Sequence, residues 1–282
     1  GGNTGTSYGI YAMYGAYHKT YNNSVHLIGG SASSYAGYFN YTNSTYSNNE
    51  VLNNIFANTN GGRGVMFYAG PSSYETVFDY NNIYTTGTLL IASSSASSPP
   101  VSAQHTTIAE WRAATGQGMN SLSYRPAFAS STDLTPDPAD SASWALNGRG
   151  IHIPGNNADI NGNPRSEIPP EGVPDLGAIE FTPTALPPLA TAAPDTIATG
   201  TTQVFTFGGD TVARITWNSA TTPASVDVRQ YSGAIPPAYT APDTMYFYTT
   251  VEAGGAPYDY DLDVYYKDPW IGSVKAENAV RL

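Results

Sequence analysis

The stretch Val51-Leu-Asn-Asn54-Ile-Phe56, followed by Gly61-Gly-Arg-Gly64-Val-Met-Phe-Tyr68, is repeated a short distance later in the chain. The second copy reads Val77-Phe-Asp-Tyr-Asn-Asn82-Ile-Tyr84 and then Gly87-Thr-Leu-Leu-Ile91. Each copy has two short runs of apolar, β-branched and aromatic residues separated by a turn, a pattern that predicts two strands. This part of the sequence therefore contains an internal repeat of strand pairs.

A weaker copy precedes these two. Val25-His-Leu-Ile28 corresponds to the first strand, Tyr38-Phe-Asn-Tyr41 corresponds to the second, and Ile10-Tyr11 fits the second strand of a still earlier turn. Val25, Val51 and Val77 are evenly spaced, and a fixed period of about 20 to 50 residues is the signature of a solenoid. Helix-favouring residues are scarce here, so the stacked units are strands. We therefore expect an all-β chain that begins with a parallel β-helix.

The paired Asn residues of the repeat suggest how its coils are held together. Identical Asn side chains that stack from coil to coil can bond to the chain above and below. Asn54 and Asn82 are the candidates for such a ladder. The alternative is that Asn only tolerates a left-handed turn conformation at these positions, and either interpretation is consistent with stacked coils.

Three blocks within residues 50–181 resemble a known family. They are "DYNNIYTTGTLL", "TIAEWRAATGQGMNSL" and "ADINGNPRSEIPPEGVPDLGAIEF". In this order they are similar to the terminal coils of right-handed parallel β-helix regions in large secreted proteins of Gram-negative bacteria. The resemblance covers roughly residues 50–181, and it implies an extracellular, cell-surface location without implying one chemistry. Where the family often has a "SPAIDAG"-like line, this sequence has "SASWALNGRG".

The composition excludes several classes of function. The 282 residues carry a net charge of −11 with only 11 Lys and Arg, which disfavours nucleic acid as a partner. Cys is absent, so disulfides, a thiol nucleophile and Cys-ligated metals are excluded, and we expect no cofactor. No apolar run approaches the roughly 18 residues of a membrane span. The chain opens on Gly1-Gly-Asn-Thr-Gly rather than on Met, so we expect it to be a piece of a longer protein.

One helix is predicted, over residues 106–115. Thr107 and Glu110 have the spacing of a capping box, and Gly116 follows as a stop signal. Ile108 and Trp111 share one face of this helix, which we expect to lie over the coils. Residues 117–181 contain short apolar pieces between turns, and they are expected to form irregular coils that close a β-helix domain spanning 1–181.

A second domain is expected after a linker. Residues 182–200 are rich in Pro, Thr and Ala, a composition typical of a semi-rigid linker. Residues 201–282 contain short alternating runs separated by Gly, Pro or Asn, which predict a small antiparallel β-sandwich of immunoglobulin type. Trp217 and Trp270 are expected in its core. The six predicted strands are Gln203–Phe207, Val212–Trp217, Ser225–Gln230, Met245–Val251, Tyr258–Tyr266 and Trp270–Val274.

The sequence contains few residues that are suited to catalysis. A glycosidase needs two carboxylates at about 5 to 10 Å, and Glu50, Glu75 and Asp79 are the acids of the repeat. A lyase needs a base beside a cation. The candidates for that pair are Lys19, Arg63, His18 and His26. We expect the acids to be solvated at coil corners and His26 to face solvent, so no catalytic site is predicted.

Two further groups of polar residues lie near the end of the predicted coils. Asp159-Ile-Asn-Gly-Asn163 has oxygen ligands at alternate positions but lacks the terminal Glu of a calcium loop, so a tight turn is expected and no metal. Arg165, Asp175 and Glu180 are predicted to form a closing ion pair that stabilises the last coil.

Tyr residues on outward positions of stacked coils would form an aromatic face suited to sugar rings or to another protein; alternatively, Tyr simply fills strand positions. We expect a non-catalytic structural or adhesive segment of an extracellular bacterial surface protein or fibre. Its expected partners are other domains or copies of that protein, and polysaccharide. The alternative is a carbohydrate-active β-helix enzyme or a polysaccharide-binding module.

Asp followed by Ser or Thr and a small or aliphatic residue matches an acceptor pattern for bacterial O-linked glycans. The candidate sites are Ser141, Thr196, Thr211 and Thr244, with Thr196 expected to be the most accessible. The alternative is that these pairs are ordinary turn starts, because Asp bonds to the backbone two residues on. Asn22, Asn40 and Asn43 match the N-linked pattern, which matters only in a host with that pathway.

Overall fold

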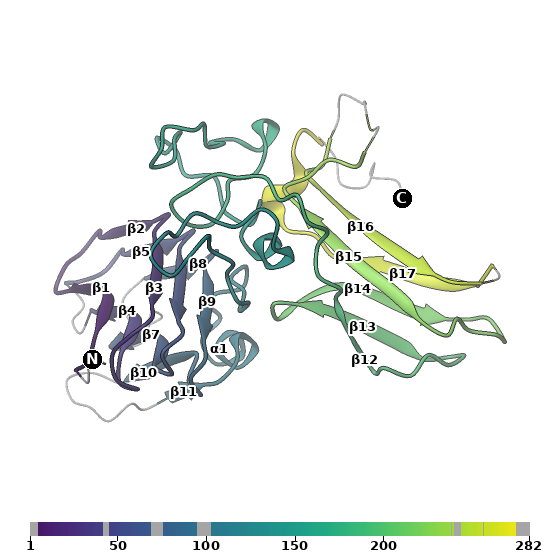
Figure 1. Cartoon of the computed structure of the whole chain (residues 1–282), viewed down its shortest axis with the longest axis horizontal. Helices are drawn as coiled ribbons and strands as arrows, with labels where there is room; N and C mark the ends of the chain where they lie inside the picture. Colours follow the sequence, from purple (N-terminus) through teal and green to yellow (C-terminus); the bar gives the residue numbers. More distant parts are fainter. Residues whose placement is uncertain are drawn as a thin grey trace.

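The structure is a computed structural model that describes residues 5–41, 45–68, 76–94, 103–237, 239, 244–255 and 257–274. The fold is all-β, as the sequence predicts, with little helix in these ranges. Figure 1 shows an N-terminal group of strands and a C-terminal group, joined by residues 116–190, a mostly irregular stretch that we call the middle segment.

The N-terminal strands form three sheets in which neighbouring strands run parallel. The chain visits the sheets in a constant order, so each strand pairs with the corresponding strand of the next turn. Strand β11 runs antiparallel to β10 and ends the first sheet. The first sheet contains β1 (Tyr8–Met13), β4 (Tyr35–Asn40), β7 (Arg63–Tyr68), β10 (Ile91–Ser94) and β11 (Ala103–His105); the second contains β2 (Lys19–Tyr21), β5 (Glu50–Leu52) and β8 (Val77–Asp79); the third contains β3 (Ser24–Leu27), β6 (Ile55–Asn58) and β9 (Asn82–Thr85).

The even spacing of Val25, Val51 and Val77 is not the structural repeat. Val25 lies in β3 opposite Phe56, whereas Val51 lies in β5 opposite Phe78. The expected two strands per repeat are also wrong, because a bend at Asn53, which has a left-handed φ of 59°, separates β5 from β6. The number of residues between one strand of a sheet and the next strand of the same sheet varies, because the connections between strands differ in length. A fixed interval in the sequence therefore does not mark equivalent positions.

The side chains that fill the space between the three sheets are largely aromatic. Phe39 and Phe67 stack at 5.3 Å between ring centroids, and Trp111 stacks on Phe67 at 5.6 Å. All three are almost fully buried. Burying an aromatic side chain of this size stabilises a fold by roughly 1.5 to 3 kcal/mol, so this column is a major part of the N-terminal core.

Helix α1 (Ile108–Thr115) matches its prediction closely. Thr107 accepts a hydrogen bond from the Glu110 amide, and the Glu110 side chain accepts one from the Thr107 amide. Gly116 ends the helix in a left-handed conformation. The buried face presents Ile108 and Trp111 to the aromatic core, so α1 covers the end of the stacked sheets.

The middle segment continues along the sheets before leaving them. Leu122 forms a parallel bridge with Asn82, which adds an irregular rung beside β9. Further on, Gly177 donates a hydrogen bond to the Asn53 carbonyl, so this segment returns to the side of β5 and β6. The segment also contains the short 3-10 helices η2 (Ser141–Ala145) and η3 (Pro169–Glu171).

The C-terminal strands are antiparallel and form two sheets within the described residues. One sheet has four strands and the other has two. They are β12 (Thr191–Ala193), β13 (Thr202–Phe207), β14 (Asp210–Trp217) and β17 (Tyr260–Val264), and then β15 (Val226–Ser232) and β16 (Phe247–Ala253).

Two expectations differ from the structure here. Thr191–Ala193, expected within the linker 182–200, forms β12 and pairs with β13. The start of that segment is also anchored, because Trp144 donates to the Ala185 carbonyl at 2.8 Å. Trp270–Val274, expected as a strand, begins within the 3-10 helix η4 (Asp268–Ile271), in whose first turn lies Pro269. Proline favours the first turn of a helix and removes a ladder donor from a sheet.

The two expected core tryptophans are both buried, but in different places. Trp217 lies within a cluster that also contains Phe205 and Ile215 of the C-terminal sheet. Trp270 stacks on Phe247 of β16 at 5.5 Å between ring centroids and donates a hydrogen bond to the Gly148 carbonyl at 2.6 Å, so it lies between the C-terminal strands and the middle segment. The cluster around Trp217 also includes Ile55 of β6 and Leu176 of the middle segment. The C-terminal sheet therefore shares one apolar core with the middle segment and with strand β6 of the N-terminal sheets.

Candidate functional site

Four tyrosines form a continuous aromatic surface on the first sheet. Strand pairing places Tyr8 opposite Tyr35 and Tyr11 opposite Tyr38. The rings of each pair stack, with centroids 5.8 Å and 4.9 Å apart. We call Tyr8, Tyr11, Tyr35 and Tyr38 the tyrosine surface.

Contacts between the pairs fix this surface as a unit. Tyr8 meets Tyr11 and Tyr38 edge to face at 4.9 and 5.2 Å. The side chains of Tyr8 and Tyr11 are 43% and 48% exposed, whereas Ile10 and Ala12 of the same strand pack against the core. Tyr8 and Tyr11 are three positions apart and still in contact, so β1 does not alternate strictly between faces. The strand nevertheless has a core side, with Ile10 and Ala12, and an open aromatic side.

The border of the tyrosine surface carries a cation. The Arg63 guanidinium lies 5.2 Å from the centroid of the Tyr35 ring and donates a hydrogen bond to the Tyr35 hydroxyl. Burial and the neighbouring tyrosine hydroxyls raise the pKa of Tyr38, and burial raises the pKa of Tyr8. A tyrosine hydroxyl is protonated at neutral pH even with its ordinary pKa, so both hydroxyls can donate hydrogen bonds to a ligand there, and the raised pKa extends this to more alkaline pH.

A ladder of Asn side chains runs along the bends between the second and third sheets. The Asn54 carboxamide oxygen accepts from the Asn23 amide at 3.0 Å, and the Asn81 carboxamide oxygen accepts from the Asn54 amide at 2.9 Å. Ser121 extends the column by accepting from the Asn81 amide. Asn54 is thus a ladder member, but Asn82 is not, because its side chain bonds to the backbone of Tyr124.

The acidic residues considered for catalysis are held by structural contacts. Glu50 bonds to the Tyr21 hydroxyl and lies 3.7 Å from Lys19. Asp79 accepts hydrogen bonds from the backbone and side chain of Asn120 at 2.7 and 2.9 Å. Glu75 lies outside the described residues.

The histidines also have local partners. His26 was expected to face solvent, but it is half-buried beside Phe128, with 5.6 Å between ring centroids, and it shares a hydrogen bond with Thr59. Burial lowers the pKa of His26. His18 lies against the Tyr41 ring at 6.0 Å. His18 and His26 therefore pack against aromatic rings at separate places.

The expected closing ion pair joins Arg165 to Glu180 at 2.6 Å. Arg165 reaches Asp175 through the backbone carbonyl, at 2.9 Å, rather than through the carboxylate. The Asp175 carboxylate instead accepts from the amides of Gly148 and Phe181 at 2.6 and 2.8 Å. Burial, followed by repulsion from Glu180, raises the pKa of Asp175. Together these bonds connect the two ends of residues 148–181 to each other through Asp175, and connect Arg165 to the second end.

The Asp159–Asn163 segment forms a tight turn. One Asp159 oxygen accepts from the amides of Asn161 and Asn163, both at 2.8 Å, and the other accepts from the Asn163 side chain and the Glu180 amide. In the described ranges, acidic and histidine side chains do not gather into a group of three able to hold a metal ion.

The glycosylation candidates differ in accessibility. Thr196 is exposed, whereas Ser141, Thr211 and Thr244 are half-buried. Ser141 begins η2 and Thr211 lies within β14, so these two are part of regular structure. The N-linked pattern residues Asn22 and Asn40 are at least half-buried, and Asn43 lies outside the described residues.

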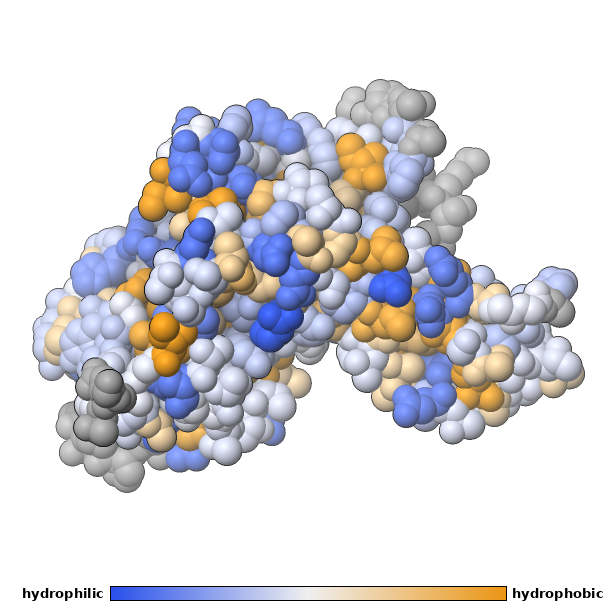
Figure 2. All heavy atoms as spheres, in the orientation of Figure 1, coloured by the Kyte–Doolittle hydropathy of each residue, from blue (hydrophilic) through white to orange (hydrophobic). Residues whose placement is uncertain are grey.

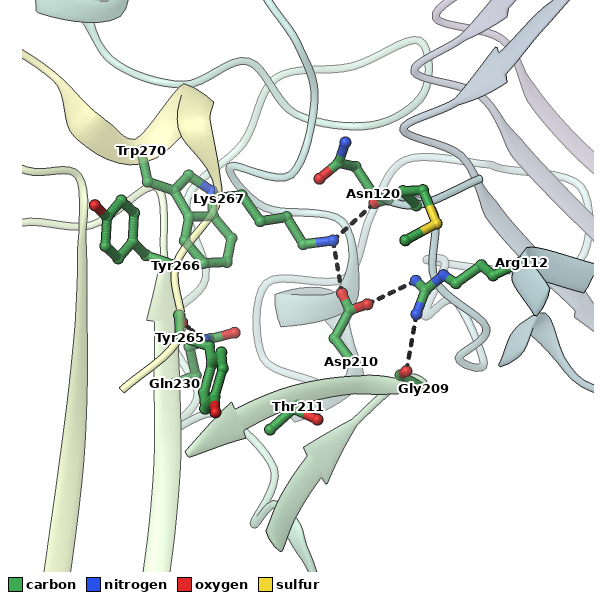
Figure 3. A pocket seen from close by; sticks show the side chains of 11 residues that line it. Arg112, Asn120, Gly209, Asp210, Thr211, Gln230, Tyr265, Tyr266, Lys267 and Trp270 are labelled. Atoms are coloured by element: carbon green, nitrogen blue, oxygen red, sulfur yellow. Dashed lines mark hydrogen bonds and ion pairs between the residues drawn. The ribbon is translucent and has the colours of Figure 1, made fainter. Parts of the chain in front are cut away.

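A pocket of about 340 Å³ lies between α1, the start of β14 and the segment that follows β17 (Figure 3). The Asp210 carboxylate on its wall is bound on one side by Arg112 at 2.6 Å and on the other by Lys267 at 2.8 Å. Lys267 also donates to the Asn120 carbonyl at 3.1 Å. No sequence motif marked this site, because its charged residues come from distant parts of the chain.

Comparison of the chain with family models, with curated proteins and with solved structures gave no significant match. Among the described residues, no helix has the length and apolar character needed to span a bilayer. On the face shown in Figure 2, apolar residues occur as scattered patches between polar ones.

Proposed function

We propose that the chain is a non-catalytic, adhesive segment of a large extracellular protein on a bacterial surface. In this proposal the N-terminal sheets are the end of a right-handed parallel β-helix, and its partners are polysaccharide and other domains or copies of the same protein. The recurring order of strands and the parallel register within the three sheets, apart from the antiparallel edge strand β11, support a stacked-coil architecture. The Asn23, Asn54 and Asn81 ladder supports it as well.

The proposed second unit is an immunoglobulin-like sandwich. An antiparallel four-stranded sheet with Trp217 and Phe205 in its core supports this assignment. Its core is shared with Ile55 of β6 and Leu176 of the middle segment, which favours a rigid spacer over a freely moving module.

The tyrosine surface is the observation that carries the adhesive role. Flat, preordered aromatic rings can contact the apolar face of a sugar ring while their hydroxyl groups bond to its hydroxyls. The rings of Tyr11 and Tyr38 already stack at 4.9 Å, so binding orders few additional side-chain torsions. Less ordering means a smaller entropic cost of association.

The alternative of a carbohydrate-active enzyme rests on Glu50, Glu75 and Asp79. Strand register places Glu50 opposite Val77, and Asp79 opposite Leu52. Both acids also bond to neighbouring side chains, Tyr21 and Asn120. These contacts give the described acids a structural role and favour the non-catalytic proposal.

Binding to a panel of polysaccharides tests the proposal. Tyr11→Ala removes one ring of a stacked pair and should weaken binding at least tenfold. Tyr17→Ala is the matched control, because Tyr17 is 71% exposed and lies outside the tyrosine surface. Equal binding by both variants would reject the tyrosine surface as the adhesive site. Chain cleavage of a polysaccharide by the wild type, lost in Glu75→Gln, would establish the enzymatic alternative.

A further inference from the structure

The pocket between α1, β14 and the segment after β17, which we call the junction pocket, is surrounded by more buried positive charge than negative charge. Arg112 and Lys267 share the single carboxylate of Asp210, and their side chains are only 14% and 13% exposed. A third cation, Arg149, is 2% exposed and interacts electrostatically with Asp210 and Lys267. Three cations therefore surround one anion in a setting where unpaired charge is costly.

Arg149 is incompletely bonded. Its Nε donates to the Trp144 carbonyl at 2.8 Å and one terminal nitrogen donates to Gln230 at 3.2 Å. The other terminal nitrogen is buried and has no hydrogen-bond partner among the described residues. Burial lowers the pKa of Arg149 to about 10, so the side chain stays charged at neutral pH.

Arg149 lies directly behind the wall of the pocket. Gln230, which accepts its hydrogen bond, lines the pocket, and so does Trp270, whose ring centroid is 5.6 Å from the guanidinium. The positive field of Arg149 therefore adds to that of Arg112 and Lys267 within the pocket.

The cations on the pocket wall retain donor capacity. Arg112 has five N–H groups, and four of them are used by Gly118, Gly209, Ser121 and Asp210. Lys267 has three N–H groups; one donates to the Asn120 carbonyl, and the ammonium forms an ion pair with Asp210. Each cation thus has at least one N–H left within the described contacts to offer to an incoming oxygen.

We propose that this pocket binds a small organic acid, whose carboxylate meets Lys267 and Arg112 and whose ring-sized body lies against the aromatic wall. Tyr265, Tyr266 and Trp270 form that wall beside the cations (Figure 3). The volume is at the lower end of the range of about 300 to 1,000 Å³ found for small-molecule sites. A carboxylate that displaces water here offsets the excess charge, and this proposal is independent of the tyrosine surface.

Calorimetric titration with benzoate and glucuronate tests the proposal and separates an aromatic body from a sugar body. Benzamide and glucose are their uncharged counterparts, and inorganic phosphate tests a bare anion. We expect saturable binding of at least one acid, at least tenfold weaker binding of its neutral counterpart and weaker binding of phosphate. Amide resonances of Asn120, Thr211 and Trp270 in the wild type should shift with the same saturation curve.

Lys267→Gln should weaken binding of that acid at least tenfold. Lys19→Gln is the control and should leave binding unchanged, because Lys19 lies on β2, away from the pocket, with a side chain that is 59% exposed. The absence of saturable binding of both acids by the wild type would overturn the proposal. So would binding that is equal for phosphate, or resonance shifts confined to residues away from the pocket. The resonance measurement uses only wild-type protein, so it remains decisive if Lys267→Gln fails to fold.

Discussion

A carboxylate oxygen of Asp210 lies 2.6 Å from a guanidinium nitrogen of Arg112, so helix α1 on the N-terminal sheets is bound directly to strand β14 of the C-terminal sheet. The two residues are 98 positions apart in the chain. Asp210 is also paired with Lys267, which approaches from the segment after β17. One buried carboxylate thus connects three parts of the fold.

Removal of this negative charge should destabilise the protein strongly. Asp210→Asn leaves buried cations without their counter-ion, and breaking such a pair costs about 3 to 5 kcal/mol. Lys19→Gln is the control, because the exposed Lys19–Glu50 pair at 3.7 Å contributes at most about 1 kcal/mol. Urea unfolding followed by Trp fluorescence measures both. A loss below 1 kcal/mol for Asp210→Asn would mean that the carboxylate does not hold the junction together.

The Asn ladder gives a second prediction. Asn54→Ala removes an acceptor for Asn23 and a donor to the carbonyls of Thr20 and Leu52, all in a fully buried position. Each buried group left without a partner costs about 1 to 3 kcal/mol, so we expect a loss of at least 3 kcal/mol in the free energy of unfolding. Asn161→Ala, at an exposed side chain, should change it by less than about 0.5 kcal/mol. Similar losses for the two variants would contradict a stabilising ladder.

The ladder also shows where sequence reasoning succeeds and where it fails. Asn54 was found because an Asn pair recurs in the repeat, but aligning the two pairs by letter selected Asn82. In the structure, each Asn of the ladder follows a residue with left-handed φ, and that residue is Asn53 before β6 and Tyr80 before β9. The backbone conformation defines the equivalent position, so Asn81 follows Tyr80 into the ladder. Letter matching cannot detect that shift.

Local signals predicted more of the fold than distant ones. The capping box of Thr107 and Glu110 and the stop at Gly116 depend on residues within one helix, and α1 has them as predicted. The junction pocket instead depends on Arg112, Asp210 and Lys267, which only tertiary packing brings together. Composition predicted a linker over residues 182–200 because Pro and Thr are frequent in linkers, but β12 and the bonds around it place part of that segment in a sheet.

Tyr41 provides a prediction for alkaline pH. It is 3% exposed, its hydroxyl has no hydrogen-bond partner among the described residues, and burial raises its pKa from 10.0 to about 12. Because the folded state holds the proton more tightly than the unfolded state, this contribution to stability is fully present below pH 10. It is lost as the pH rises from 10 to about 12.

Tyr41→Phe should therefore keep or increase stability at pH 7, because it retains the packed ring and removes an unbonded hydroxyl. Between pH 10 and 11.5 its free energy of unfolding should fall less steeply than that of the wild type. Urea unfolding at pH 7, 10 and 11.5 measures both effects. Parallel slopes in the two proteins would show that the Tyr41 hydroxyl does not titrate differently in the folded and unfolded states.

The final prediction concerns covalent modification. If the Asp-Ser and Asp-Thr pairs accept O-linked glycans, Thr196 should carry the modification, because its side chain is exposed while Ser141, Thr211 and Thr244 are half-buried. A transferase has to reach the hydroxyl, and Thr211 in β14 and Ser141 in η2 are confined by regular structure. Peptide mapping of protein from its native source should find hexose-containing adducts on Thr196, and Thr196→Val should remove that mass without affecting the fold. An unmodified Thr196 would end the proposal, and a glycan on Thr211 would show that modification precedes folding of the C-terminal sheet.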